Sequence, residues 1–329
     1  MQLSRRLAYR LKMANYWFIA QWARLAFTIL RKLPADRALA FADRFARRVG
    51  PWFGRHRVAL ANLRAAYPEK TEQEIERIAS DMWGNMGRLA AEYIFLDKLL
   101  DYDPQSSVAG RVEVTGHATF DRIASEDRAH ILFTAHLGNF ELLPIGSRQY
   151  GLKLTSMFRP PNNPYIAEYI ARTRKATMGE LLPSRTGAAI TLARLLDEGQ
   201  NVGMLVDQKF SNGIRTTFFG RVCETSPLLP RLVRRFDCDV YPAYSVRLPG
   251  NRFRIVLEEK LELPRDAEGL VDAARTAQLL NDTVERWIRQ DPGQWMWFHK
   301  RWNLGTGRRR PGAQKPGSQK PGAQKKKPA

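Results

Sequence analysis

The amino-acid sequence predicts an α/β protein, with a three-layer α/β/α arrangement around a largely parallel sheet and an interfacial or membrane helix at the N-terminus. Three observations predict it. Short apolar runs alternate with helical patterns from about residue 110 to residue 290, as in strands joined by crossover helices. Several helical stretches begin at a capping residue or a proline. The chain of 329 residues, 44% of them hydrophobic, is also long enough to bury a large core.

Charge divides the chain into three parts. Residues 1–68 contain fourteen Lys and Arg against two acids, and residues 305–329 contain eight Lys and Arg and no acid. These ends account for the whole net charge of +20, so the part between them is neutral. We predict a basic amphipathic membrane-associating helix at 1–34, a globular domain at 35–304 and a disordered basic tail at 305–329. The Pro-Gly-Ala/Ser-Gln-Lys repeats of that tail cannot form a core.

The first helix has an apolar run at residues 16–30 that is shorter than the roughly 20 residues of a membrane span. Polar side chains form one stripe along it: Gln21, Arg24, Thr28 and Arg31. Large apolar side chains occupy the rest: Trp17, Phe18, Trp22, Leu25, Ile29 and Leu30. This pattern favours a helix lying in the membrane interface. A helix packed on the protein's own core and a tilted single span are the alternatives.

The next segments are helical. Residues 35–66 are basic and are interrupted at Gly50 and Pro51, and a long helix is expected from Thr71 to about Leu100. Thr71 is a suitable N-cap, and acids follow it in the first turns, where the helix dipole favours negative charge.

The alternating half of the chain provides the sheet. Strands are predicted at 112–114, 129–135, 153–158, 201–206, 240–248 and 253–258. Helices are predicted to begin near Asn139, at Pro164 behind Asn163 and at Pro227 behind Ser226, and to cover 188–197 and 270–289.

One histidine follows an apolar strand directly. Ligands gather at the carboxyl ends of strands in such folds, and His136 stands at that position. Gly138 permits a tight turn, Asn139 can cap the next helix, and Glu141 falls in its first turn. A carboxylate there can fix the tautomer of the imidazole and leave the other nitrogen to accept a proton. These residues therefore predict a general-base pair, with a purely structural role as the alternative.

The run His-Leu-Gly-Asn-Phe-Glu at 136–141 resembles the H-x4-D/E motif of glycerolipid acyltransferases. In its fuller form it resembles the late acyltransferases of lipid A biosynthesis, the lauroyl/myristoyl acyltransferase family. Further blocks resemble that family in the same order, and the resemblance covers roughly residues 10–303: 61–68, 157–164, 204–208 with 217–220, and 292–302.

This resemblance implies a glycerolipid-acyltransferase-like fold in the 35–304 domain. It implies an O-acyltransferase that moves a fatty acyl chain from acyl carrier protein to a hydroxyl of a Kdo-bearing lipid A precursor. The expected location is the bacterial inner membrane, at its cytoplasmic face and among its lipids. His136 is then the general base and Glu141 its orienter. The expected substrate-binding residues are Arg159, Asp207, Gln208, Gly138 and Asn139.

Several roles stay open at this point. Arg159, after a strand, suits a phosphate or a thioester oxygen, and otherwise a surface ion pair. Asp207 should lie near His136 and bind a sugar hydroxyl or hold Arg159, or serve as a turn carboxylate. Residues 217–220 suit a loop at the lipid or the acyl tunnel, or core packing. His299 is expected to be structural, within an aromatic wall of Trp295, Trp297 and Trp302.

Other classes of function receive less support. His56, His117 and His130 fit no metal-ligand spacing, so neither a metal nor any other cofactor is expected, and a metal hydrolase is the weaker alternative. Cys223 and Cys238 form no C-x-x-C motif and are expected to be free thiols. The basic charge lies outside the folded domain and no nucleic-acid-binding motif accompanies it, so no nucleic acid is expected as a partner. Another glycolipid acceptor, such as a phosphatidylinositol mannoside, is the alternative within the enzyme class.

Overall fold

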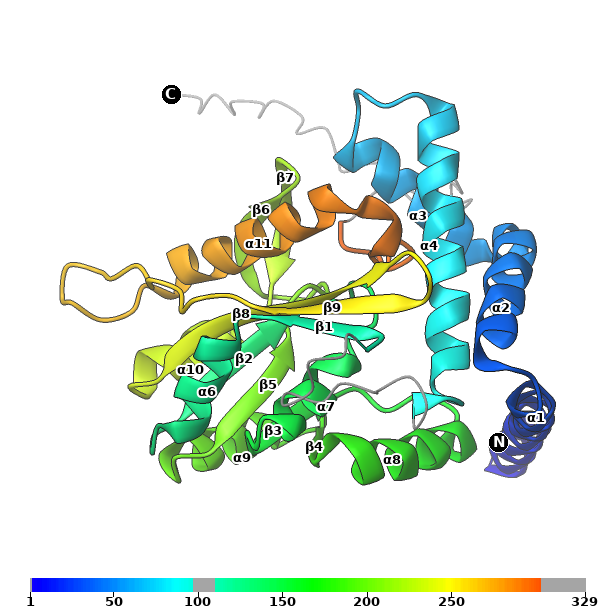
Figure 1. Ribbon diagram of the computed structural model, residues 1–329, viewed down its shortest axis with the longest axis horizontal. Coiled ribbons are helices and arrows are strands. Elements are labelled where there is room, and N and C mark those ends of the chain that lie inside the picture. The colour runs from blue at the N-terminus through cyan, green and yellow to red at the C-terminus, as the bar shows by residue number, and fades with distance from the viewer. Residues whose placement is uncertain (1, 97–109, 303–329) are drawn as a thin grey trace, which may run out of the picture.

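The computed structural model describes residues 2–96 and 110–302, and the predicted tail at 305–329 lies outside them. Its main feature is a seven-stranded sheet in the order β1-β9-β8-β2-β5-β3-β4 (Figure 1). From β8 to β4 all neighbouring strands are parallel, and β9 runs antiparallel to β8. The fold is therefore a mixed α/β fold with a parallel-dominated sheet flanked by helices.

The sheet strands occupy these residues: β1 Val112–Thr115, β2 His130–Thr134, β3 Leu154–Phe158, β4 Glu180–Pro183, β5 Asn201–Leu205, β8 Asp239–Leu248 and β9 Arg252–Leu257. The helices are α1 Gln2–Arg31, α2 Ala35–Val49, η1 Gly50–Trp52, α3 Gly54–Ala66, α4 Glu72–Glu92, α6 His117–Ser125, α7 Leu142–Gln149, α8 Pro164–Met178, α9 Ala188–Asp197, α10 Leu228–Arg235, α11 Ala273–Gln290 and η2 Pro292–Gln294. A separate hairpin joins β6 Ile214–Phe218 to β7 Arg221–Thr225.

Core residues cover both faces of the sheet. Ile131 and Phe133 of β2 belong to the larger cluster, together with α9, α10 and α11. Leu132, between them, belongs to a second cluster with α6 and α7. Alternate side chains of a strand point to opposite faces, so β2 is buried on both. Figure 1 shows α11 on one side of the sheet and α7 on the other.

The predicted elements are mostly present. All six predicted strands form, and Thr71 caps α4 through a capping box with Glu74. Asn163 caps α8, and α9 occupies the predicted residues. The predicted break at Gly50 and Pro51 is the short helix η1. The end predicted for the long helix, near Leu100, lies outside the described residues.

The prediction missed α6, β4 and the β6–β7 hairpin. In the hairpin, Thr216 and Phe218 are buried while their neighbours on β6 are exposed. That alternation extends over only five residues in each strand, and a turn at Phe219 and Gly220 joins them. So short a pattern gives a weak signal in a sequence.

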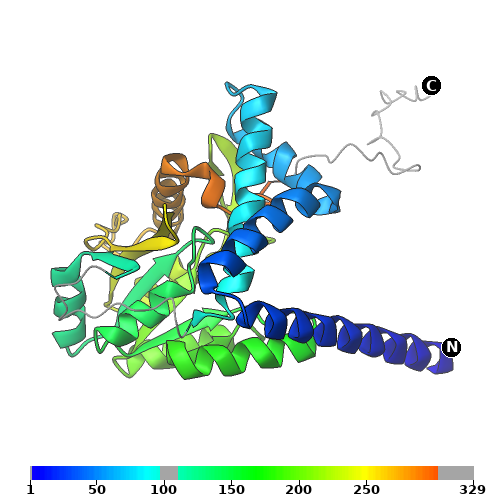
Figure 2. The same cartoon turned by 45° about the vertical axis from the view of Figure 1, so that its right-hand side comes forward.

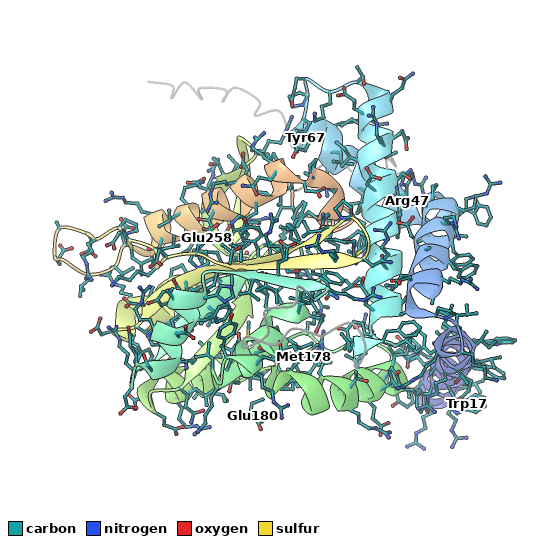
Figure 3. All side chains as sticks on the ribbon, in the orientation of Figure 1. Trp17, Arg47, Tyr67, Met178, Glu180 and Glu258 are labelled. Atoms are coloured by element: carbon teal, nitrogen blue, oxygen red, sulfur yellow. The ribbon has the colours of Figure 1, made fainter. Side chains whose placement is uncertain are left out.

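Helix α1 leaves the body of the molecule at its N-terminal end (Figure 2). Its Phe27 and Leu30 pack against a small core of α2 and the end of α4, and the amide of Asn163 donates to the carbonyl of Tyr16 at 2.8 Å. Several other large side chains of α1 are exposed, among them Trp17, labelled in Figure 3, whereas Tyr16 is half-buried. Within the described residues, no helix combines the length and apolar character that a membrane crossing requires.

Candidate active site

His136 lies just beyond the carboxyl end of β2, where the chain turns before α7. The turn depends on Gly138, whose φ of +56° is in the left-handed region. A Cβ at this position would lie 2.3 Å from the carbonyl oxygen of Ser245, so any side chain would collide with the neighbouring backbone. The predicted turning role of Gly138 is confirmed, and it acts through backbone shape.

Both nitrogens of the His136 imidazole have partners. Nδ1 lies 2.8 Å from Oδ1 of Asp207, and the backbone N–H of His136 donates to Oδ2 of the same carboxylate at 2.9 Å. Nε2 lies 3.2 Å from the side-chain nitrogen of Gln208. A carboxylate only accepts, so Nδ1 carries the proton and the Nε2 lone pair accepts from the Gln208 amide. Nε2 is thus in its basic form, and a substrate hydroxyl that donates to it takes the place of Gln208.

Asp207 is almost fully buried and follows β5, the strand next to β2. Trp295 also donates to Oδ2, at 2.8 Å. Burial alone would raise the pKa of Asp207, but the charge and hydrogen bonds of His136, with the Trp295 donor, outweigh it and hold the pKa at about 2. The expected position near His136 is confirmed. In the described residues Asp207 pairs with His136 and not with Arg159, so the expectation that Asp207 holds Arg159 is corrected.

Glu141 does not make the expected hydrogen bond with His136. It is buried and forms a two-pronged ion pair with Arg174 of α8, with Nε 2.9 Å from Oε2 and Nη2 in contact with Oε1. Arg174 also donates to the hydroxyl of Tyr93 at 2.8 Å. The predicted orienter of the imidazole is thus corrected: Asp207 occupies Nδ1, and Glu141 neutralises a buried arginine. Arg174 was not among the predicted site residues, because an arginine within a helical pattern has the sequence signature of a surface residue.

The loop from His136 to Glu141 rests on a buried polar network. The side chain of Asn139 accepts from the N–H of Glu141 at 3.1 Å and donates to Glu92 at 2.8 Å. Glu92 in turn pairs with Arg247 of β8 through both carboxylate oxygens, and both residues are buried. The prediction that Asn139 caps the next helix is corrected: α7 begins at Leu142 with Glu141 at its N-cap and no side-chain cap. Asn139 instead closes the turn before the helix, and its amide nitrogen is anchored to the ion pair.

Arg159 follows β3 and its side chain is exposed. Because β3 neighbours β5, Arg159 lies at the same edge of the sheet as Asp207 and His136. Gly138 and Asn139 are buried in the loop below. Of the five predicted substrate-binding residues, Arg159 and Gln208 are therefore accessible to a substrate. The other three, Gly138, Asn139 and Asp207, are buried and support the loop and the imidazole.

The C-terminal aromatic residues form a wall at this edge. Trp295 donates to Asp207, and the rings of Trp295 and Trp297 are 4.7 Å apart. Phe218 and Phe219 pack into that wall and are buried, which agrees with the core-packing alternative for residues 217–220. His299 lies within electrostatic range of His136 and Asp207, and burial lowers the pKa of His299.

A narrow apolar cavity adjoins the site. It lies between the sheet and helices α7 and α8, and Glu141 and Arg174 supply charge in a lining that is mostly apolar. Its walls include Phe140, whose ring is 4.9 Å from that of His136, and Met178, labelled in Figure 3. Gly203 of β5 also lines it. This mostly apolar lining is chemically suited to a hydrocarbon chain.

Metal and thiol chemistry gain no support from the described part of the chain. There, no group of three or more histidine, cysteine, aspartate or glutamate side chains has the arrangement of a metal site. Both cysteines are free, as predicted, and both are buried. Burial raises the pKa of Cys238 to about 12.

A histidine with one unprotonated nitrogen near an apolar cavity defines a class of site, one suited to proton transfer on a substrate with a fatty chain. Residues 6–304 match the model of the bacterial lipid A biosynthesis acyltransferases. The chain therefore belongs to that family.

Curated relatives agree with this assignment. A lipid A biosynthesis acyltransferase of Haemophilus influenzae is 22% identical over 292 residues, 86% of each chain. A lipid A biosynthesis myristoyltransferase of Escherichia coli is 24% identical over 267 residues, 80% of each chain. A lipid A biosynthesis lauroyltransferase of the same organism is 24% identical over 255 residues, 75% of this chain and 78% of the relative.

Proposed function

We propose that this acyltransferase moves a fatty acyl chain from acyl carrier protein to a hydroxyl of a lipid A precursor, at the cytoplasmic face of the bacterial inner membrane. The family assignment supports lipid A acylation. The observation that carries the mechanism is the imidazole of His136, held by Asp207 at Nδ1 and unprotonated at Nε2, near an apolar cavity. The expected three-layer arrangement is supported by the cores on both faces of the sheet.

The reaction is a direct transfer. Nε2 of His136 removes the proton of the acceptor hydroxyl as its oxygen forms a bond to the thioester carbonyl. The carbon–sulfur bond then breaks, and the imidazolium returns the proton to the departing thiolate. Asp207 stabilises the imidazolium, and the Gln208 amide beside Nε2 supplies a donor for the oxyanion. An acyl-enzyme is unnecessary, and the raised pKa of Cys238 disfavours one on that thiol.

The acyl chain lies in the apolar cavity, with its thioester carbon toward His136. Phe140 joins the two places, because it contacts the imidazole and lines the cavity. Glu141 and Arg174 add a neutral ion pair to the wall, so the cavity carries no unbalanced charge. Arg159, exposed at the same edge, suits a phosphate of a substrate.

The N-terminal helices hold the enzyme at the membrane surface. On α2 one exposed stripe carries Arg37, Phe41, Arg44, Phe45 and Arg48, opposite the face that packs on α4. Phe41 and Phe45 stack on each other at 5.8 Å and face away from the core. Together with the exposed aromatic residues of α1, this stripe combines apolar insertion with attraction to anionic lipid.

The test is acyl transfer by the purified protein in detergent. Acyl carrier proteins loaded with different chain lengths are offered with a Kdo-bearing lipid A precursor, and mass spectrometry follows the acceptor. A gain of one acyl chain is expected, and His136→Ala should reduce its rate about 10²–10⁴-fold. No gain with any donor from a folded wild type would contradict the proposed substrates, and full activity of His136→Ala would contradict the mechanism.

Membrane association is tested separately by flotation with vesicles. The wild type should float with vesicles that contain anionic lipid, and less with neutral vesicles. Phe41→Ser/Phe45→Ser should weaken flotation, since both side chains are exposed and their loss removes little packing. Equal flotation of the wild type and this double variant would remove α2 from the proposed surface.

A further inference from the structure

A cationic pocket lies beside the active site and has no part in the mechanism above. It is bounded by the β6–β7 hairpin, the segment after Gln208 and the last described residues of the chain. Three cations line it, Lys209, Arg215 and Arg301, against a single carboxylate, Glu224. It contains about 650 Å³ of empty space, part of it open to solvent. Its lining charge is thus net positive, in a hollow large enough for a small anionic group.

Arg301 is the unusual member of this set. Its side chain is about 1% exposed, and it donates to the carbonyl of Glu224 at 2.8 Å, to Thr225 at 2.9 Å and to Asn281 at 3.0 Å. All three acceptors are neutral. Within residues 2–96 and 110–302, no carboxylate comes within ion-pair distance of its guanidinium, and Nε has no hydrogen-bond partner.

The buried Arg247 behaves differently. Its charge is neutralised by Glu92 through both carboxylate oxygens. A buried charge without a partner is costly, and a protein normally supplies a counter-charge. Burial accordingly lowers the pKa of Arg301, and the charge of Asp207, which lies beyond ion-pair distance, offsets this only in part. The difference indicates that the counter-charge of Arg301 comes from a ligand.

The hairpin adds a second arginine to the pocket. Arg215 of β6 and Glu224 of β7 are direct cross-strand neighbours in the antiparallel register. In the described part of the chain neither side chain forms an ion pair, and Arg215 is exposed. Glu224 therefore reduces the positive charge of the pocket without cancelling it.

The pocket lies close to the catalytic residues along the chain. Asp207 binds Nδ1 of His136, Gln208 lies at Nε2, and the next residue, Lys209, lines the pocket. Two residues of extended chain span roughly 7 Å. From the other side, the guanidinium of Arg301 lies over the ring of Phe218 at 5.1 Å, and Phe218 contacts Trp295 at 5.7 Å. These contacts place the pocket beside the catalytic residues, within the length of one substrate molecule.

We propose that the pocket of Lys209, Arg215 and Arg301 binds a phosphate ester of one substrate while the reacting end of that substrate lies at His136. Guanidinium and ammonium groups together suit phosphate oxygens. The identity of the ligand rests on the proposed function, in which both substrates carry phosphate: the phosphopantetheine of the donor and the phosphorylated lipid acceptor. The pocket is suited to the phosphate group that both substrates have in common, and the kinetic experiment below distinguishes the donor from the acceptor.

Anion binding is measured first, without any acyl transfer. The probe is inorganic phosphate, compared with chloride at equal ionic strength, and the readout is the thermal midpoint Tm. Saturating phosphate should raise the Tm of the wild type by roughly 2–4 °C. Lys209→Ala/Arg215→Ala should lose most of this shift. The matched control is Lys153→Ala/Arg235→Ala, which removes two exposed cations near the amino ends of β3 and β8, at the opposite edge of the sheet, and should retain the shift.

Kinetics then identify the source of the phosphate. One arm compares acyl-phosphopantetheine with acyl-pantetheine as donor, and the other compares the phosphorylated acceptor with its dephosphorylated form. Removing the phosphate that occupies the pocket should raise the wild-type KM roughly tenfold or more. In Lys209→Ala/Arg215→Ala the KM should already be raised and should respond little to the same removal.

Two results would overturn the assignment. The first is a phosphate-induced Tm shift that is equal in the pocket variant and the control variant. The second is a rise in KM on phosphate removal that is equally large in the wild type and in the pocket variant, in both kinetic arms. A wild type that binds phosphate in this pocket but transfers no acyl chain would instead contradict the proposed function and leave the anion site standing. Arg301 is not replaced in the main variant, because it also donates to Glu224 and Thr225 of the hairpin and its loss would disturb the fold.

Discussion

Two buried carboxylates flank the His136 loop, and they have opposite partners. Asp207 lies 71 residues away in sequence and binds the imidazole. Glu141 lies five residues away and binds the guanidinium of Arg174. Proximity along the chain thus did not decide which carboxylate orients the histidine. The sheet order decided it, because β5 adjoins β2 and brings Asp207 to the imidazole.

The largest expected effect separates these two carboxylates by activity. Asp207→Asn keeps the shape but allows the wrong tautomer of His136, so we expect kcat to fall about 10²–10⁴-fold. Glu141→Gln leaves the hydrogen bond at Nδ1 intact and should reduce kcat less than about tenfold. The measurement is the rate of acyl transfer under saturating donor and acceptor.

Circular dichroism and Tm values must first establish that both variants are folded. An equal loss of kcat in the two variants would contradict the conclusion that Asp207, and not Glu141, orients His136. A larger loss in Glu141→Gln would restore the pairing that its position in the sequence suggested.

The sequence supports most of the fold for clear physical reasons. The apolar runs of the parallel strands and the caps at Thr71 and Asn163 are local signals, and each appears where it was predicted. His136 and Asp207 were recognisable because both directly follow such strands. What a single sequence lacks is the lateral order of the strands, and with it the choice between Asp207 and Glu141.

Arg174 shows a second limit of sequence reasoning. It belongs to α8, whose neighbouring Arg172 forms an exposed ion pair with Glu168. In the sequence these two arginines look alike, although Arg174 turns toward Glu141 and a buried cavity. Only the packing of α8 against α7 distinguishes them.

The next effect compares the two arginines of α8. Arg174→Met leaves Glu141 buried without its counter-charge, and we expect the free energy of unfolding to fall by about 3–5 kcal/mol. Arg172→Met, the matched control, should change it by less than about 1 kcal/mol, because its pair is exposed. Urea unfolding followed by circular dichroism gives both values.

Replacing both members of the buried pair sharpens this test. Glu141→Leu/Arg174→Met removes the charge together with its partner, so it should recover much of the stability that Arg174→Met loses. If the double variant is no more stable than Arg174→Met, the loss arises from other contacts of Arg174, such as the hydroxyl of Tyr93.

A smaller effect concerns the pH dependence of stability at Asp207. Its pKa is about 2 in the folded protein and near 3.8 in the unfolded chain, so the folded state binds the proton more weakly. The resulting stabilisation is fully present above about pH 4 and is lost as the pH falls toward 2. The shift corresponds to about 2 kcal/mol. Asp207→Asn should lose less stability than the wild type between pH 5 and pH 2.5, and parallel curves would contradict the coupling to His136.

The smallest effect tests the cavity on the Glu141 side of the loop. Gly203 lines it, and an added Cβ would lie 3.2 Å from Leu154 and 3.3 Å from Ser156, close enough to narrow the space. Gly203→Val should therefore shift the preference among acyl donors toward shorter chains, by roughly tenfold in the ratio of kcat/KM values. Competition between two acyl carrier proteins that carry acyl chains of different length measures that ratio directly.

Gly151 offers a control, since an alanine there meets no neighbour within 4 Å, although its φ of +72° adds backbone strain. An unchanged ratio in a folded Gly203→Val would mean that the acyl chain lies elsewhere, and the Glu141–Arg174 pair would then be a packing feature alone.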